Sequence, residues 1–133
     1  MIKTALCVIA KADFLSGKNR ADNRYRLALY TSEASLNDET MAYTTAGEVI
    51  GLGYEPGGKD IKNWSTGTQG RTGYIAFDPV MWNVSTITAR GALVYNDSRP
   101  GMPAVAVLDF GVDIVSRNGP FTVKMPDRLL TLT

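Results

Sequence analysis

The chain has 133 residues, of which 44% are apolar and 20% charged, and its formal net charge at pH 7 is +1. This length is typical of one globular domain, and it suffices for a hydrophobic core without a metal or a disulfide. A net charge so close to zero excludes a strong general attraction to nucleic acid, because phosphate binding requires a concentrated basic surface. No run of eighteen apolar residues is present, and the first ten residues lack the flanks and cleavage site of a secretory signal. We therefore expect a soluble protein that is made inside the cell and has no membrane segment.

The first seventeen residues follow the spacing of a helix, since apolar side chains recur every three or four positions and Gly17 stands where a helix commonly ends. The run Ala5 to Ala10 also fits a buried strand, and periodicity alone does not separate the two interpretations. The single cysteine, Cys7, lies between Leu6 and Val8, which favours a buried structural thiol over a nucleophile. A polar connector, residues 18–23, follows.

From Arg24 onward the hydrophobic period changes from three or four residues to two, beginning with a strand at Arg24–Thr31. Further strands are predicted at Ala46–Gly51, Lys59–Trp64, Gly73–Phe77, Ser85–Tyr95, Ala104–Phe110, Phe121–Met125 and Arg128–Leu132. Turn residues separate them at 55–58, 66–67, 78–79, 96–101 and 117–120. The sequence thus predicts an all-β fold, a single β-sandwich or jelly-roll-like barrel of about eight short strands. Residues 1–23 form an N-terminal helix or arm, and residues 24–133 form the sandwich domain.

The sequence lacks the residue types that most catalytic and metal sites require. With no histidine and one cysteine, zinc and redox chemistry are excluded. Asp109 with Asp113, or Asp38 with Glu39, has the carboxylates for acid–base work or calcium, but Asp109 stands where a strand ends and is predicted to bind turn amides. We therefore expect no catalytic residue, no metal and no cofactor, and a protein that is not an enzyme.

The segment from Gly53 to Lys59 matches the glycine and lysine spacing of a phosphate-binding P-loop. Asp60 stands where the motif requires a hydroxyl, and its carboxylate would repel phosphate. The residues that follow have the pattern of a strand instead of a helix. We predict no nucleotide binding, and we assign Gly53, Tyr54, Gly57 and Gly58 to a structural motif in which the glycines have positive φ.

The aromatic residues and Arg90 are predicted to be structural. Most of the tyrosines and tryptophans alternate with apolar neighbours in strands, which favours core packing over a stacking platform. They are Tyr25, Tyr54, Trp64, Tyr74, Trp82 and Tyr95. Arg90 has the small neighbours Thr88 and Ala92 in the longest strand pattern, which leaves room for its side chain beside a carboxylate partner.

Charge is distributed unevenly along the chain. Residues 1–30 carry six basic and two acidic side chains, a net charge of +4, whereas residues 31–60 carry one basic and six acidic side chains, a net charge of −5. This asymmetry fits either a basic face that meets an acidic neighbour or two solvated surfaces. On the first interpretation Lys3, Lys11, Lys18 and Arg20 bind a partner.

Several segments between residues 24 and 126 form an ordered set with characteristic spacing. They are Ala28–Ser32, Ala42–Thr45, Gly47–Val49, Gly51–Tyr54 with Gly57-Gly58, Phe77-Asp78 with Trp82, Ser85–Asn96, Ala104–Gly111, and Asn118–Val123 with Pro126. Together they resemble a family of small virion structural proteins of tailed bacteriophages.

This resemblance implies a homo-oligomeric structural protein of the virion, present in many copies and made in the bacterial host cytoplasm. The resemblance does not determine whether the protein belongs to the head or to the tail. A head decoration or cement protein would bind at junctions of the major capsid protein, whereas a tail-associated or fibre-attachment protein would bind tail or portal-adaptor proteins. Residues 1–23 lie outside the resemblance, so they are either an attachment arm that docks on a neighbouring subunit or a helix that caps the open end of the sandwich.

Overall fold

The computed structural model describes residues 1–124 and 130–132, which form one helix and eight strands. The elements are β1 (Ala5–Leu6), α1 (Val8–Leu15), β2 (Tyr25–Tyr30), β3 (Lys59–Asp60), β4 (Ser65–Gln69), β5 (Thr72–Ala76), β6 (Val80–Asn96), β7 (Ala104–Val123) and β8 (Leu130–Leu132). One antiparallel sheet has the order β1-β7-β6-β2-β3, and a second has the order β4-β5-β8. Neither sheet closes into a barrel, and the prediction of an all-β fold with a short helix is confirmed.

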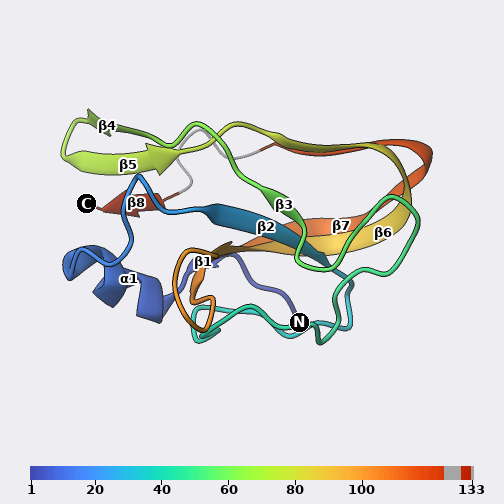
Figure 1. Cartoon of the computed structure of the whole chain (residues 1–133), viewed down its shortest axis with the longest axis horizontal. Coiled ribbons are helices and arrows are strands. Elements are labelled where there is room, and N and C mark those ends of the chain that lie inside the picture. Colours follow the sequence, from blue (N-terminus) through green and yellow to red (C-terminus); the bar gives the residue numbers. More distant parts are fainter. Residues whose placement is uncertain (125–129, 133) are drawn as a thin grey trace.

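The long hairpin of β6 and β7 organises the molecule, because each strand contributes to two layers. β6 has 17 residues and β7 has 20. Their pairing shifts register at four places, between Trp82 and Ser85, Ser85 and Ile87, Ala89 and Gly91, and Val94 and Tyr95. Such bulges bend a ribbon and increase its twist. Figure 1 shows the consequence: both strands bend at one end of the molecule and return in a second layer above β2.

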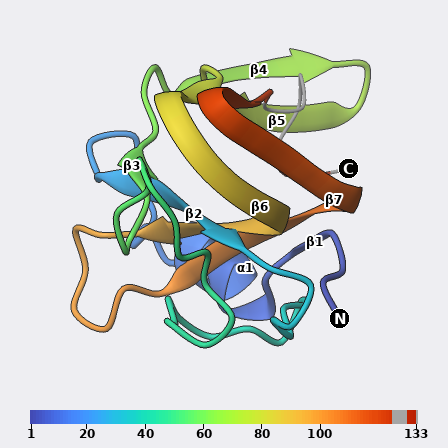
Figure 2. The same cartoon turned by 90° about the vertical axis from the view of Figure 1, so that its right-hand side faces the viewer.

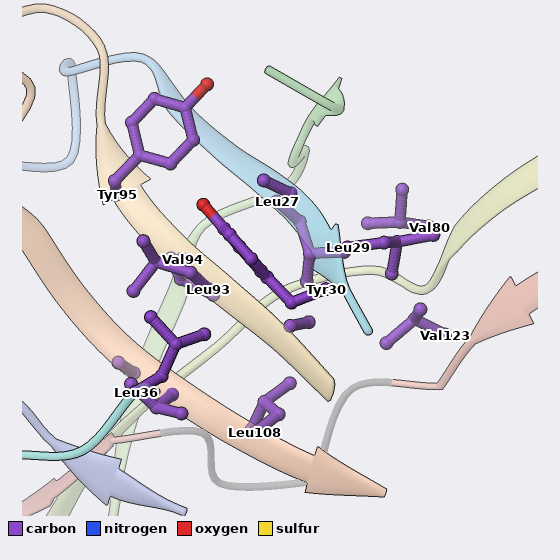
Figure 3. Packing of buried hydrophobic residues seen from close by; sticks show 14 of the residues in the cluster. Leu27, Leu29, Tyr30, Leu36, Val80, Leu93, Val94, Tyr95, Leu108 and Val123 are labelled. Carbon is purple, nitrogen blue, oxygen red and sulfur yellow. The ribbon is translucent and has the colours of Figure 1, made fainter. Parts of the chain in front are cut away.

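The core lies between these layers and is built around β2. Five of the six β2 side chains are buried, so this strand is covered on both faces and not on one alternating face as predicted. Figure 3 shows residues from β2, both halves of the β6–β7 hairpin and a loop packing together. They are Leu27, Leu29, Tyr30, Leu36, Val80, Leu93, Val94, Tyr95, Leu108 and Val123.

Several predicted strand boundaries are wrong. Residues 46–51 form no strand, although Tyr30 makes an isolated bridge with Glu48. The strand predicted at Lys59–Trp64 is reduced to β3, and the expected turn at residues 66–67 lies inside β4. The expected turn at residues 117–120 lies inside β7, where Asn118 has a φ of 50°. Of the last two predicted strands, residues 125, 128 and 129 lie outside the described residues.

The N-terminal helix is shorter than predicted, because Ala5 and Leu6 pair with β7 before α1 begins. The helix ends at Leu15, and Gly17 follows with a φ of 75°, while the Lys18 N–H donates to the Asp13 carbonyl at 2.8 Å. Cys7 is fully buried, which confirms the structural thiol, and burial raises its pKa to about 11. The buried Asp13 forms an ion pair with Arg99 at 2.6 Å. These contacts attach the N-terminal segment to the rest of the fold.

Candidate functional site

The irregular segment between β2 and β3 is anchored by the side chain of Glu48, which is buried. Its carboxylate accepts hydrogen bonds from the Tyr43 hydroxyl at 2.6 Å, the Tyr54 hydroxyl at 2.5 Å and the Gly57 N–H at 2.9 Å. Burial first, and the hydrogen bond to Glu48 second, raise the pKa of both phenols. The Tyr54 hydroxyl also accepts from the Leu29 N–H at 3.0 Å. The Glu48 carboxylate thus holds three parts of this loop together, and Tyr54 links the loop to β2.

The glycines of the segment from Gly53 to Lys59, which has the spacing of a P-loop, allow this loop to pack closely against the neighbouring strands. Gly53, Gly57 and Gly58 have φ values of 87°, 96° and 78°, which confirms the predicted positive φ. A Cβ at Gly58 would lie 1.8 Å from the Leu27 carbonyl oxygen, and one at Gly53 would lie 2.2 Å from the Val84 carbonyl oxygen. The Gly57 amide already binds Glu48, and β3 follows where a P-loop requires a helix. These glycines therefore serve close packing of the loop against β2 and β6.

The same loop holds two aliphatic side chains in solvent beside the strand bend. Ile50 is 98% exposed and Leu52 is 79% exposed. The Thr86 N–H donates to the Leu52 carbonyl at 2.9 Å, so the loop lies along β6. A Cβ at Gly51 would lie 2.5 Å from the Thr86 carbonyl oxygen. The alternation of glycine with a large aliphatic residue therefore brings the backbone close to β6 and directs the aliphatic side chains outward.

Two further exposed aliphatic residues lie on the paired strands β6 and β7. Val84 of β6 is 65% exposed and Val115 of β7 is 52% exposed, and Val115 pairs with Thr88 across the hairpin. We define the bend face as Ile50, Leu52, Val84, Thr86, Thr88 and Val115. Ile50, Thr86, Thr88 and Val115 line one shallow hollow of about 340 Å³, together with Thr31, Ile87, Ser116 and Arg117. Figure 2 looks onto the bend, where β6 and β7 run side by side across the front of the molecule.

The bend face has the character of a protein interface. Single exposed aliphatic residues are ordinary on protein surfaces, whereas a contiguous group with polar surroundings marks a contact with another macromolecule. Its backbone is fixed by strand pairing and by the loop that Glu48 anchors. A surface with a fixed backbone binds a partner without a large cost in conformational entropy.

Comparisons with protein-family models, with curated proteins and with solved structures found no match.

Lys3 and Lys11, two of the four basic residues predicted to bind a partner, border different hollows. Lys3 borders a hollow that Arg90 and Asp109 also line, whereas Lys11 of α1 borders a groove beside β5. Lys18 follows the end of α1, and Arg20 lies 3.6 Å from the carboxylate of its neighbour Asp22.

Arg90 lies beside carboxylates, as the strand pattern predicts. Its Nε is 3.5 Å from Asp109 and its Nη1 is 3.9 Å from Asp113. Asp109 also accepts a hydrogen bond from the Gly111 N–H at 2.9 Å, which confirms its predicted contact with a turn amide. Both carboxylates thus face a guanidinium group.

Within residues 1–124 and 130–132, no group of three His, Cys, Asp or Glu side chains is placed to hold a metal ion. The same residues contain no helix that is long and apolar enough to cross a membrane. Four of the six aromatic residues predicted for the core, Tyr25, Tyr54, Trp82 and Tyr95, are buried, and Trp64 and Tyr74 are half-buried.

The bend face itself was not predicted from the sequence. The sequence predicts a strand at residues 46–51, which would place alternate side chains in the core. The usable signal is the sequence Ile50-Gly51-Leu52-Gly53, in which each large aliphatic residue is followed by a glycine. Only the approach of this segment to β6 explains that alternation, and the sequence does not reveal such an approach.

Proposed function

We propose that this chain is a structural protein of a tailed-bacteriophage particle, and specifically a capsid decoration protein that binds where major capsid subunits meet. The observation that carries the proposal is the bend face, where four aliphatic side chains are exposed on a backbone fixed by strand pairing: Ile50, Leu52, Val84 and Val115. The resemblance of residues 24–126 to small virion structural proteins supports the choice of particle.

The chemistry of the described residues also supports binding over catalysis. The carboxylate pairs considered from the sequence are used within the fold or lie on exposed loops: Asp109 and Asp113 face Arg90, while Asp38 and Glu39 belong to a tight turn capped by Asn37. The buried Glu48 is surrounded by donors from its own loop. A fixed surface that excludes water on contact is what a cement protein requires.

The proposal is tested by adding purified protein to particles that lack it and measuring bound copies by quantitative mass spectrometry. We expect many copies on heads. Leu52→Asp should reduce the affinity for particles at least about tenfold, because a buried leucine contributes roughly 1.5–3 kcal/mol and a charge replaces it. Met41→Asp is the matched control, since Met41 is 61% exposed outside the bend face, and it should bind like the natural chain.

Two results would overturn the proposed station or the proposal itself. A few copies confined to tails would exclude decoration and identify a tail-associated protein. Absence of binding to heads and tails alike would exclude a virion structural role. Equal binding by Leu52→Asp and Met41→Asp would remove the bend face from the interface.

A further inference from the structure

The bent part of β7 has a backbone edge that no described strand covers. One side of β7 pairs with β6, and Figure 2 shows the two strands side by side there. On the other side β1 pairs only with Ala106 and Val107, before the bend. Within residues 1–124 and 130–132, the backbone of residues 112–117 has no strand, bridge or loop partner besides β6. Such an unpaired edge is a template for a further strand.

The backbone groups of Val115 point to this open edge. Successive residues of an antiparallel strand direct their N–H and C=O groups to opposite sides. The Ile87 N–H points to β7, because it donates to the Ser116 hydroxyl at 3.3 Å, so the backbone groups of Thr88 point away from β7. Thr88 and Val115 are therefore a pair without mutual hydrogen bonds, and the Val115 N–H and carbonyl point away from β6. A strand added at this edge would bond to Val115.

The opposite edge of the same ribbon, on β6, is bonded by other parts of the chain. The Thr86 N–H donates to the Leu52 carbonyl at 2.9 Å. The Lys59 Nζ donates to the Met81 carbonyl at 2.8 Å. The loop before β3 and Lys59 of β3 thus cover the β6 edge at two places, and the β7 edge is the one that is open to a partner.

The residues on either side of Val115 make this edge complementary to itself. Asp113 lies two positions before Val115 and Arg117 two positions after it, so the two side chains have opposite charge and the same face of the strand. When two identical strands pair antiparallel about Val115, Asp113 of each lies opposite Arg117 of the other. Both side chains are available for this contact, because Arg117 is exposed and Asp113 is half exposed, at 3.9 Å from Arg90. Opposite charges in such cross-strand pairs stabilise a sheet.

We propose that the open edge of β7 binds the same edge of a second copy of this chain, antiparallel and about a two-fold axis at Val115. The Val115 N–H of each copy then donates to the Val115 carbonyl of the other, and an Asp113–Arg117 pair lies at each end. The paired segment is short, because positive φ values at Gly111 and Asn118 interrupt the strand on either side. Such an isologous contact closes into a dimer. The inference goes beyond the proposed function and does not depend on it.

The test exchanges the charges at the two ends of the paired segment. Asp113→Arg brings two arginines together at each end of a dimer, and Arg117→Asp brings two aspartates together. Each variant alone should dimerise at least about tenfold more weakly than the natural chain in sedimentation velocity. An equimolar mixture should form heterodimers as tightly as the natural chain dimerises, because each arginine then faces an aspartate. Asp38→Arg and Arg71→Asp, at exposed positions outside β7, are the matched controls and should dimerise normally.

A second variant tests the backbone contact without changing charge. Val115→Pro removes the N–H that points to the open edge, and proline is tolerated on an edge strand where its nitrogen faces solvent. We expect this variant to keep the circular dichroism spectrum of the natural chain and to be monomeric.

Three results would overturn the inference. The natural chain could stay monomeric up to millimolar concentration, Val115→Pro could fold and still dimerise, or the charge-exchange variants could stay monomeric when mixed. A chain that dimerises through this edge but binds no particle overturns the proposed function alone.

Discussion

Glu48 illustrates how one buried charged residue sets the position of a whole loop. It is 8% exposed and accepts three hydrogen bonds. Hydrogen bonds to a charged group contribute roughly 1.5–3 kcal/mol, and removing the acceptor leaves buried donors unsatisfied. We predict that Glu48→Leu lowers the free energy of unfolding by about 3 kcal/mol, measured by urea denaturation. Glu33→Leu, at an exposed position, should change it by less than about 0.5 kcal/mol. A loss below about 1 kcal/mol for Glu48→Leu would show that the tyrosines and Gly57 bind elsewhere without it.

At this scale the sequence predicts apolar burial better than polar contacts. Tyr25, Trp82 and Tyr95 lie in alternating patterns, and all three are buried. Cys7 between two apolar residues is buried as well. Nothing in the sequence around Glu48 distinguishes it from the exposed Glu33, because its donors come from an irregular loop with no periodicity. A buried carboxylate becomes recognisable only when the backbone path is known.

Gly58 determines how closely the loop before β3 approaches β2. Its φ is 78°, and an added Cβ would lie 1.8 Å from the Leu27 carbonyl oxygen. Gly101 is a matched control, because its φ is 80° and an added Cβ would meet nothing within 4 Å. Gly101→Ala should cost roughly 1–2 kcal/mol from backbone conformation alone. Gly58→Ala should cost at least about 2 kcal/mol more in the same urea measurement, because the strands must separate. Equal losses would mean that the loop moves aside freely.

At the scale of elements, the sequence predicts where strands occur but not how long they are. The period of two is present in Tyr25–Tyr30 and in the middle of β6, and both are strands. Asn118-Gly119-Pro120 reads as a turn, yet it lies within β7 at a register shift. Bulges and turns use the same residues of positive φ, so local sequence does not distinguish them. Pairing with β6 decides the outcome, and pairing is a long-range property.

The whole molecule is a two-layer structure whose shape follows from the bend of one hairpin. The bend also produces the exposed surface on which the proposed function rests, because β6 and β7 present one face to the core and the other to solvent as they cross between layers. The sequence predicts neither the bend nor the open edge of β7. Both depend on contacts between segments far apart in the chain, such as Leu52 with Thr86 and Ala5 with Val107.

Burial of phenols throughout the molecule makes its stability sensitive to alkaline pH. Burial raises the pKa of five tyrosines, Tyr25, Tyr30, Tyr43, Tyr54 and Tyr95. For Tyr95 the value rises to about 12. The folded chain therefore holds these protons more tightly than the unfolded chain, whose phenols titrate near pH 10. The stabilisation is fully present below about pH 10 and is lost as the pH rises through the folded-state values.

We therefore predict cooperative alkaline unfolding, in which tyrosinate absorbance and the loss of β-structure in circular dichroism occur together as the pH rises beyond about 10. Each such phenol steepens the fall in stability by up to about 1.4 kcal/mol per pH unit, because the unfolded chain releases one more proton than the folded chain. Tyr95→Phe removes one of these protons, so the slope between about pH 10 and pH 12 should become shallower by up to that amount, even though the lost hydrogen bond to the Gly57 carbonyl lowers stability at neutral pH. If all five phenols ionised near pH 10 while the fold stayed intact, the tyrosines would be accessible to water. That result would contradict their burial between the two layers.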